Sequence, residues 1–95
     1  MKLLMAIVRD DYAADVTYAL NGKGFSVTRI STTGGFWRRG NVTLLVGLDD
    51  SRVDEALGVI NENAGPEVDA SIAPAGHAPR RATIFVLNVG QFAHY

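Results

Sequence analysis

The sequence predicts an α+β domain in which two helices cover one face of an antiparallel sheet. Two strongly apolar segments near the ends of the chain, residues 3–8 and 82–89, are typical of strands. Two β-branched segments lie in the middle, and two amphipathic segments with helical spacing separate them from the outer strands. The order strand, helix, strand, strand, helix, strand is that of the ferredoxin-like βαββαβ sandwich.

Length and composition limit the possible functions. The 95 residues form a single domain, 1–95. Nine Lys and Arg against ten Asp and Glu give a net charge of −1, which does not favour nucleic acid or a membrane surface as partner. The absence of cysteine excludes disulfides, thiolate metal sites and a cysteine nucleophile. The longest apolar run is far shorter than a membrane span of about 20 residues. We expect no secretory signal and a cytoplasmic, soluble protein.

The first strand and the first helix follow directly from the hydrophobic pattern. Leu3–Val8 is a continuous apolar run, which predicts a central strand buried on both faces. Asp10 or Asp11 is placed to cap the following helix. The residues 21–24, Asn-Gly-Lys-Gly, end that helix. The predicted buried side of the helix comprises Tyr12, Val16, Ala19 and Leu20.

The middle of the chain reads as a hairpin. Residues 25–33 are rich in β-branched side chains and predict the second strand. Residues 42–48 predict the third strand, and a loop over 33–41 joins the two.

The second helix begins after paired aspartates. Ser51-Arg52-Val53-Asp54 has the form of a capping box, and residues 63–66, Asn-Ala-Gly-Pro, end the helix. A short edge strand over 68–72 and an exposed loop over 74–81 precede the last strand. The buried stripe of the helix comprises Val53, Ala56, Leu57 and Ile60. With helices on one sheet face only, we expect the bare face to be covered by trimerisation.

The loop at the tip of the hairpin carries the most informative chemistry. It reads Thr32-Thr33-Gly34-Gly35-Phe36-Trp37-Arg38-Arg39-Gly40-Asn41. Glycines expose backbone N–H groups to an anion, and aromatic rings offer faces on which a purine can stack. The two arginines suit phosphate, so together these groups suit a nucleotide. The alternative from composition alone is a hairpin whose aromatic residues pack on a neighbouring subunit.

Other polar residues have simpler explanations. His77 and His94 lack the accompanying ligands of a metal site. The pairs Asp10-Asp11 and Asp49-Asp50 stand where helices begin, where the helix dipole favours carboxylates. Arg80-Arg81 fits a solvated loop. The sequence contains neither a phosphate-binding loop motif nor the setting of a nucleophilic serine, so it shows no catalytic constellation.

These residues resemble a known family, the cyclic-di-AMP receptors of the PII-like superfamily. The resemblance rests on the run from Thr32 to Asn41, on Ala6-Ile7-Val8-x-Asp10, on Arg52-Val53-Asp54-Glu55 with Val59-Ile60-Asn61, and on Ala82-Thr83-x-Phe85-Val86. Residues 1–63 and 82–95 align without gaps. The resemblance implies a ferredoxin-like, PII-like homotrimer that binds cyclic-di-AMP between its subunits and signals, without catalysis, to a downstream protein.

The resemblance also implies a ligand-binding set and shows three departures from the family. The set comprises Thr28, Gly35, Phe36, Trp37, Asn41, Gly47 and Phe85, with Arg38 or Arg39 as the source of positive charge. The family usually has an arginine where this chain has Ser26 and a leucine where it has Trp37. The stretch 67–81 is shorter than the family's large, ligand-responsive loop by more than a dozen residues.

The sequence therefore predicts a receptor for a nucleotide second messenger, with cyclic-di-AMP as the leading ligand and no cofactor. One alternative is a trimer of the same superfamily that binds ATP, ADP or another small anion. A second is a metal-responsive trimer similar to the CutA proteins, which would use His77 and His94. A third is an acylphosphatase-like enzyme, which would need an anion-binding loop after the first strand. Here Arg9 leads instead into two aspartates.

Overall fold

The structure is a computed structural model that describes residues 1–30, 40–66, 81–91, 93 and 95. Its strands are β1 (Lys2–Arg9), β2 (Val27–Ile30), β3 (Asn41–Leu48) and β4 (Ala82–Asn88). The helices are α1 (Asp10–Gly22) and α2 (Val53–Asn63), and a short 3-10 helix, η1 (Asp50–Arg52), leads into α2. None of the helices in these ranges is long and apolar enough to cross a membrane.

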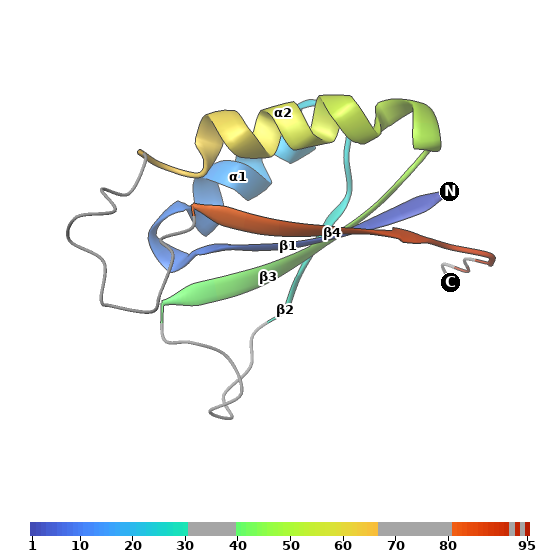
Figure 1. Cartoon of the computed structure of the whole chain (residues 1–95), viewed down its shortest axis with the longest axis horizontal. Helices are drawn as coiled ribbons and strands as arrows, with labels where there is room; N and C mark the ends of the chain where they lie inside the picture. Colours follow the sequence, from blue (N-terminus) through green and yellow to red (C-terminus); the bar gives the residue numbers. More distant parts are fainter. Residues whose placement is uncertain (31–39, 67–80, 92, 94) are drawn as a thin grey trace.

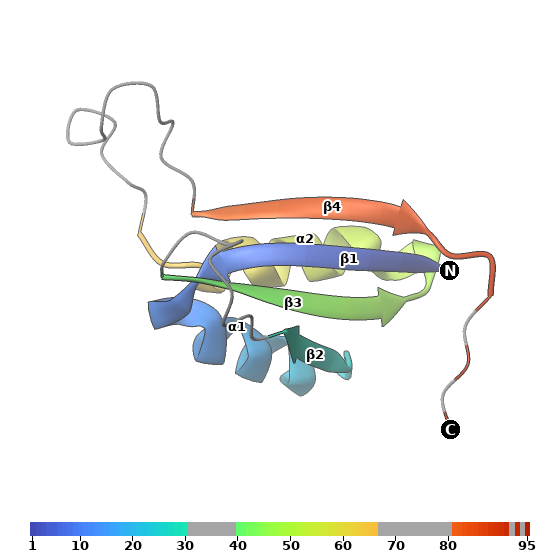
Figure 2. The ribbon, with the colours of Figure 1, turned by 90° about the horizontal axis from the view of Figure 1, so that it is seen from below.

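The strands form one antiparallel sheet in the order β2-β3-β1-β4, and both helices lie on the same face of it (Figures 1 and 2). This is the topology of the ferredoxin-like sandwich, so the predicted fold class is confirmed. The predicted hairpin is confirmed as well, because β2 pairs with β3 from Val27 opposite Val46 to Ile30 opposite Thr43.

The hydrophobic core lies between the sheet and the helices. From the two central strands it takes alternating residues, which the pleat directs to one face: Leu4, Ala6, Val8, Val42, Leu44, Val46 and Leu48. The helices contribute Ala13, Val16, Leu20, Ala56, Val59 and Ile60. The predictions of the buried helix faces are thus correct for Val16, Leu20, Ala56 and Ile60. Ala13 and Val59 are also buried although they were not predicted, and the predicted Tyr12, Ala19, Val53 and Leu57 are only partly buried.

The prediction that β1 is buried on both faces is wrong for the single chain. Leu4, Ala6 and Val8 are fully buried, but the residues between them are only partly buried. The helices cover one face of the sheet, and no segment that the structure describes covers the other (Figure 1). We call this second surface the open face. The residues that alternate onto it are Leu3, Met5, Ile7, Thr28, Ile30, Thr43, Leu45, Gly47, Thr83, Phe85 and Leu87, with Arg9 and Asn41 at the end of β1 and the start of β3.

Helix ends follow the sequence at their C-termini but not at their N-termini. Gly24 (φ +88°) and Gly65 (φ +92°) adopt the left-handed backbone that favours glycine after a helix, as predicted. The two predicted N-terminal caps are wrong. The N-cap positions of α1 and α2 are occupied by Arg9 and Arg52, and neither side chain makes a capping hydrogen bond. The aspartates instead lie within the first turns, where the helix dipole favours them.

Strand boundaries differ in places from the sequence prediction: β1 extends by one residue at each end, and β3 begins one residue earlier. The second strand begins at Val27 rather than at Phe25, because Phe25 is buried against the core and lies under the guanidinium of Arg52 at 4.0 Å. Its predicted end at Thr33 lies outside the described residues, as does the predicted edge strand over 68–72. The last strand ends at Asn88, one residue earlier than predicted.

Candidate functional site

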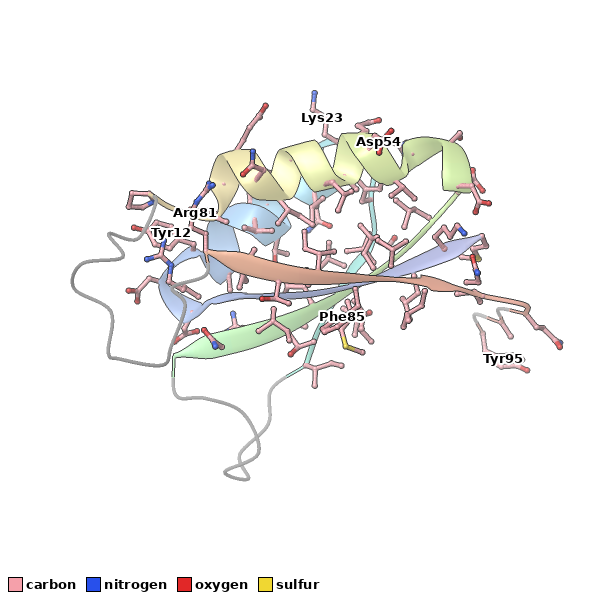
Figure 3. All side chains as sticks on the ribbon, in the orientation of Figure 1. Tyr12, Lys23, Asp54, Arg81, Phe85 and Tyr95 are labelled. Carbon is pink, nitrogen blue, oxygen red and sulfur yellow. The ribbon has the colours of Figure 1, made fainter. Side chains whose placement is uncertain are left out.

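Three of the predicted binding residues lie in the central rows of the open face, and Asn41 lies at its end. Thr28 pairs with Leu45, Leu45 with Met5, and Met5 with Phe85, so these four residues form one row across all four strands. Phe85 lies on the side of the sheet away from the helices and is half exposed (Figure 3). Gly47 belongs to the next row, with Leu3 and Leu87. The predicted set thus selects the surface that the helices do not cover.

Within one chain, these residues do not converge on one pocket. Thr28 and Phe85 lie at opposite ends of their row, three strand spacings or about 14 Å apart. Thr28 and Gly47 are diagonal neighbours, at roughly 7–8 Å. Asn41 is the first residue of β3, six positions or about 20 Å along the strand from Gly47. A single small molecule on one subunit could not bind all four.

Gly47 lies beside the side chain of Met1. A Cβ atom added at Gly47 would stand 3.2 Å from the terminal methyl carbon of Met1. Because that methyl group is the end of a flexible side chain, a small displacement would relieve the contact. Glycine at this position therefore keeps the end of the open face shallow without being required by a strained backbone, since Gly47 is not among the glycines with positive φ.

Asn41 lies where two strands and a helix begin or end. It pairs with Arg9, the last residue of β1, and the backbone N–H of Asp10 donates to the carbonyl of Gly40 at 2.6 Å. The start of β3 is therefore fixed to the turn between β1 and α1. Its exposed side chain extends the candidate site beyond the apolar rows of the open face.

Between its ends, the described part of the open face carries apolar, threonine or glycine side chains. Its one charged residue by alternation is Arg9 at the end of β1, and that guanidinium is bound to the carbonyls of Ala64 and Pro66. Arg29, one residue after Thr28, alternates to the other side, where it donates to Asp10 at 3.1 Å. Ser26 is exposed and precedes β2. An anionic ligand on this face would need a cation from another segment or another subunit.

The remaining predicted residues lie outside the described part of the chain. These are Gly35, Phe36, Trp37 and Arg38 of the hairpin loop, and His77 and His94 of the alternative metal site. Within the ranges that the structure does describe, no group of three or more His, Cys, Asp or Glu side chains could hold a metal ion.

Sequence reasoning missed three residues in the middle of the open face. Met5 and Leu45 stand between Thr28 and Phe85, and Thr43 is buried to 5% exposure between Ile7 and Ile30. The uniformly apolar run of β1 concealed the alternation that directs Met5 outward. Thr43 carried a usable signal, because it is the one polar side chain between buried apolar neighbours in β3.

Ion pairs shape the electrostatics of the opposite, helix-bearing side. Arg52 donates to Glu55 at 2.8 Å, and this hydrogen bond lowers the pKa of the Glu55 carboxyl and raises the pKa of Arg52. Asp50 accepts from the terminal ammonium of Met1 at 3.0 Å, which lowers the pKa of the Asp50 carboxyl. These groups are between 33% and 63% exposed, so they tune the start of α2 rather than form a reactive centre.

The elements define a protein of the ferredoxin-like class, in which the helices cover one face of the sheet and the open face is largely apolar. The sequence matches the cyclic-di-AMP receptor family over residues 1–80. The chain therefore belongs to the cyclic-di-AMP receptor family. Among solved structures it is similar to a functionally unknown protein from Pediococcus pentosaceus ATCC 25745. The two share 31% identity over 99% of this chain and 96% of that one, with a TM-score of 0.73.

Proposed function

We propose that this protein is a non-enzymatic receptor that binds cyclic-di-AMP in clefts between the subunits of a homotrimer. The observation that carries the proposal is the distribution of the predicted site residues over the open face of a chain of this family. The site would combine Thr28, Gly47 and Phe85 with Asn41 and with the hairpin-loop residues Gly35, Phe36, Trp37 and Arg38.

The open face supports self-association. Met1, Phe85 and Leu87 are each more than 40% exposed, and they adjoin the partly buried Leu3, Met5 and Leu45. Contiguous apolar surface of this kind is rare on monomers and marks an interface. A threefold arrangement with the open faces inward would bury this surface and leave both helices on the outside.

The separation of Thr28 from Phe85 supports a ligand between subunits. Across about 14 Å of one sheet, the two residues cannot contact the same base. When two subunits meet at their open faces, the β2–β3 end of one can approach β4 of the other. Thr28 and Gly47 of one subunit and Phe85 of its neighbour would then border one cleft.

The phosphates of the ligand require positive charge that the open face does not supply. Ser26 offers none, and Arg29 is engaged with Asp10. We assign this role to Arg38 or Arg39 of the hairpin loop, because a guanidinium can hold two phosphate oxygens at once. Replacement of the usual arginine by Ser26 is also the observation that favours the second candidate, a PII-like trimer that binds ATP, ADP or another small anion.

Calorimetric titration with cyclic-di-AMP, ATP, ADP and cyclic-di-GMP tests the proposal and separates the two candidates. We expect micromolar or tighter binding of cyclic-di-AMP, near one ligand per subunit, and a trimeric mass in sedimentation. Preferential binding of ATP or ADP would select the second candidate. Heat with none of the four would overturn the assignment of a nucleotide ligand.

Two substitutions test the residues assigned to the site. We expect Phe36→Ala to weaken cyclic-di-AMP by roughly tenfold to a hundredfold, the range for losing one stacked base. We expect Asn41→Ala to weaken it by about tenfold, the effect of one lost hydrogen bond to a charged group. Tyr18→Ala and Asn21→Ala serve as matched controls, because both residues are exposed on α1. Wild-type affinity for cyclic-di-AMP in both Phe36→Ala and Asn41→Ala would contradict the assignment of these residues to the binding site.

A further inference from the structure

Arg9 makes an unusual set of contacts at the end of β1. Its Nη2 atom donates to the carbonyl of Pro66 at 2.9 Å and to that of Ala64 at 3.3 Å. Its guanidinium stands over the ring of Tyr12, 4.9 Å from the centroid. One side chain of β1 therefore holds the segment that follows α2, more than fifty residues away in sequence.

The backbone at Arg9 is fixed to the start of β3 at the same time. Arg9 pairs with Asn41, and the N–H of the next residue, Asp10, donates to the carbonyl of Gly40. Arg9 thus contacts two segments that have no direct contact through β-pairing: its main chain holds the start of β3, and its side chain holds the end of α2.

A second guanidinium also binds the end of α2. Arg81 donates from Nε to the carbonyl of Gly65 at 2.9 Å and from Nη1 to Oδ1 of Asn61 at 2.9 Å, and it also donates to the carbonyl of Asn61. Figure 3 shows Tyr12 and Arg81 at the same end of the molecule. Cations at this position are favourable, because the last carbonyls of a helix carry partial negative charge.

The contacts of Arg9 are incompletely satisfied. Its Nε atom is buried and has no hydrogen-bond partner among the described residues, and within those residues no carboxylate pairs with the guanidinium. A buried donor without an acceptor raises the energy of this arrangement. Arg81, by comparison, makes three hydrogen bonds with the end of α2.

We propose that Arg9 is a positioning residue that couples the start of β3, including Asn41, to the C-terminal end of α2. This coupling rests on the proposed function in one respect: cyclic-di-AMP at Asn41 is the event that would displace the start of β3. A displacement there moves the backbone of Arg9 and therefore the guanidinium between Ala64 and Pro66. Because binding linkage is reciprocal, fixing the end of α2 also favours the ligand-bound position of Asn41.

Nuclear magnetic resonance of the ¹⁵N-labelled full chain tests the coupling. We expect saturating cyclic-di-AMP to shift the Arg9 Nε–H signal and the backbone amide signals of Ala64 and Gly65. In Arg9→Gln we expect ligand-induced shifts at Ala64 and Gly65 to be lost. Arg52→Gln is the matched control, because Arg52 also stacks on an aromatic ring, that of Phe25, and donates to a main-chain carbonyl, that of Lys23. It should keep the shifts.

Amide hydrogen exchange of the ligand-free protein tests the coupling independently of the proposed function. In Arg9→Gln we expect exchange of the Ala64, Gly65 and Asp10 amides to accelerate together by about tenfold, the effect of losing one hydrogen bond from a charged donor. Arg9→Lys, which keeps the charge, should give a smaller acceleration if Arg9→Gln proves too unstable to measure.

The outcomes separate the two proposals. If the wild-type protein binds no cyclic-di-AMP, the proposed function fails, and the exchange experiment still decides the coupling. If exchange accelerates at Ala64 and Gly65 but not at Asp10, Arg9 only stabilises the end of α2 and the coupling is wrong. Persistence of the ligand-induced shifts in Arg9→Gln would overturn it as well.

Discussion

Gly65 is the residue at which the chain most clearly requires glycine. Its φ of +92° is unfavourable for any side chain. A Cβ atom there would stand 2.5 Å from the ring of Tyr12 and 2.7 Å from Nη2 of Arg9. Tyr12 and Arg9 are held against each other, so neither can move away without giving up their contact. The close approach of Tyr12 and Arg9, in addition to the backbone conformation, therefore favours glycine at position 65.

Two glycine substitutions separate these effects. Gly40 has nearly the same φ, +88°, but nothing lies within 4 Å of an added Cβ. We expect Gly40→Ala to lower the free energy of unfolding by about 1–2 kcal/mol, the cost of the left-handed backbone. Gly65→Ala should lower it by about 2–4 kcal/mol, because overpacking adds to that cost. Urea unfolding at one protein concentration measures both. Equal decreases in the free energy of unfolding would show that Tyr12 and Arg9 move away from the added methyl group without an energetic cost.

At the scale of the element, Arg52 joins the beginning of α2 to the connection between α1 and β2. It donates to the carbonyl of Lys23 at 2.8 Å, lies over the ring of Phe25 and pairs with Glu55. The chain thus begins α2 with an ion pair where the sequence predicted a side-chain cap. The carboxylates of the first turn remain favourable to the helix dipole, although no cap is made.

This ion pair predicts a pH dependence of stability. The pKa of Glu55 is lowered in the folded protein by its hydrogen bond with Arg52. Such a carboxylate contributes stability above its unfolded pKa of about 4.3, and this contribution is lost as the pH falls through the lower folded pKa. We expect Glu55→Gln to reduce the unfolding midpoint at pH 7 by a small amount, because the pair is exposed.

Thermal unfolding followed from pH 7 to pH 3 measures this effect. The difference between the wild-type protein and Glu55→Gln should shrink steadily below about pH 4.5. A difference that stays constant down to pH 3 would mean that the ion pair does not carry it.

The sequence predicted elements well where local pattern and tertiary structure agree. The amphipathic helices, the hairpin and the glycines after both helices are all found as expected. It failed where the chain has alternatives of similar energy. At helix N-termini, Arg9 and Arg52 occupy the cap positions, and their guanidiniums donate to the distant carbonyls of Ala64 and Lys23. No short sequence window contains those carbonyls.

For the molecule as a whole, the open face is the feature that sequence reasoning reached only in part. A bare face followed from the count of helices, but its residues did not. Leu3–Val8 is apolar at every position, so its pattern cannot show which side chains point to the core. For the candidate site, the family resemblance selected Thr28, Gly47 and Phe85, and the β-pairing then placed them on this face and showed how far apart they lie.

The proposed trimer predicts opposite outcomes for two adjacent residues of β4. Phe85 and Val86 are similarly exposed, at 50% and 45%, but their side chains alternate to opposite faces of the sheet. Phe85→Glu would place a charge in the buried interface without its partner, which is strongly unfavourable. We expect it to give monomers in sedimentation and to abolish cyclic-di-AMP binding, because each cleft needs two subunits.

Val86→Glu is the matched control for this prediction. Its carboxylate would lie on the helix-bearing side of an edge strand, where it stays in water. We therefore expect Val86→Glu to remain trimeric and to keep its affinity for cyclic-di-AMP. Circular dichroism should show that both variants fold, since neither side chain belongs to the buried core. A Phe85→Glu variant that stays trimeric would place the interface elsewhere than on the open face, and the cleft between Thr28 and Phe85 would be lost with it.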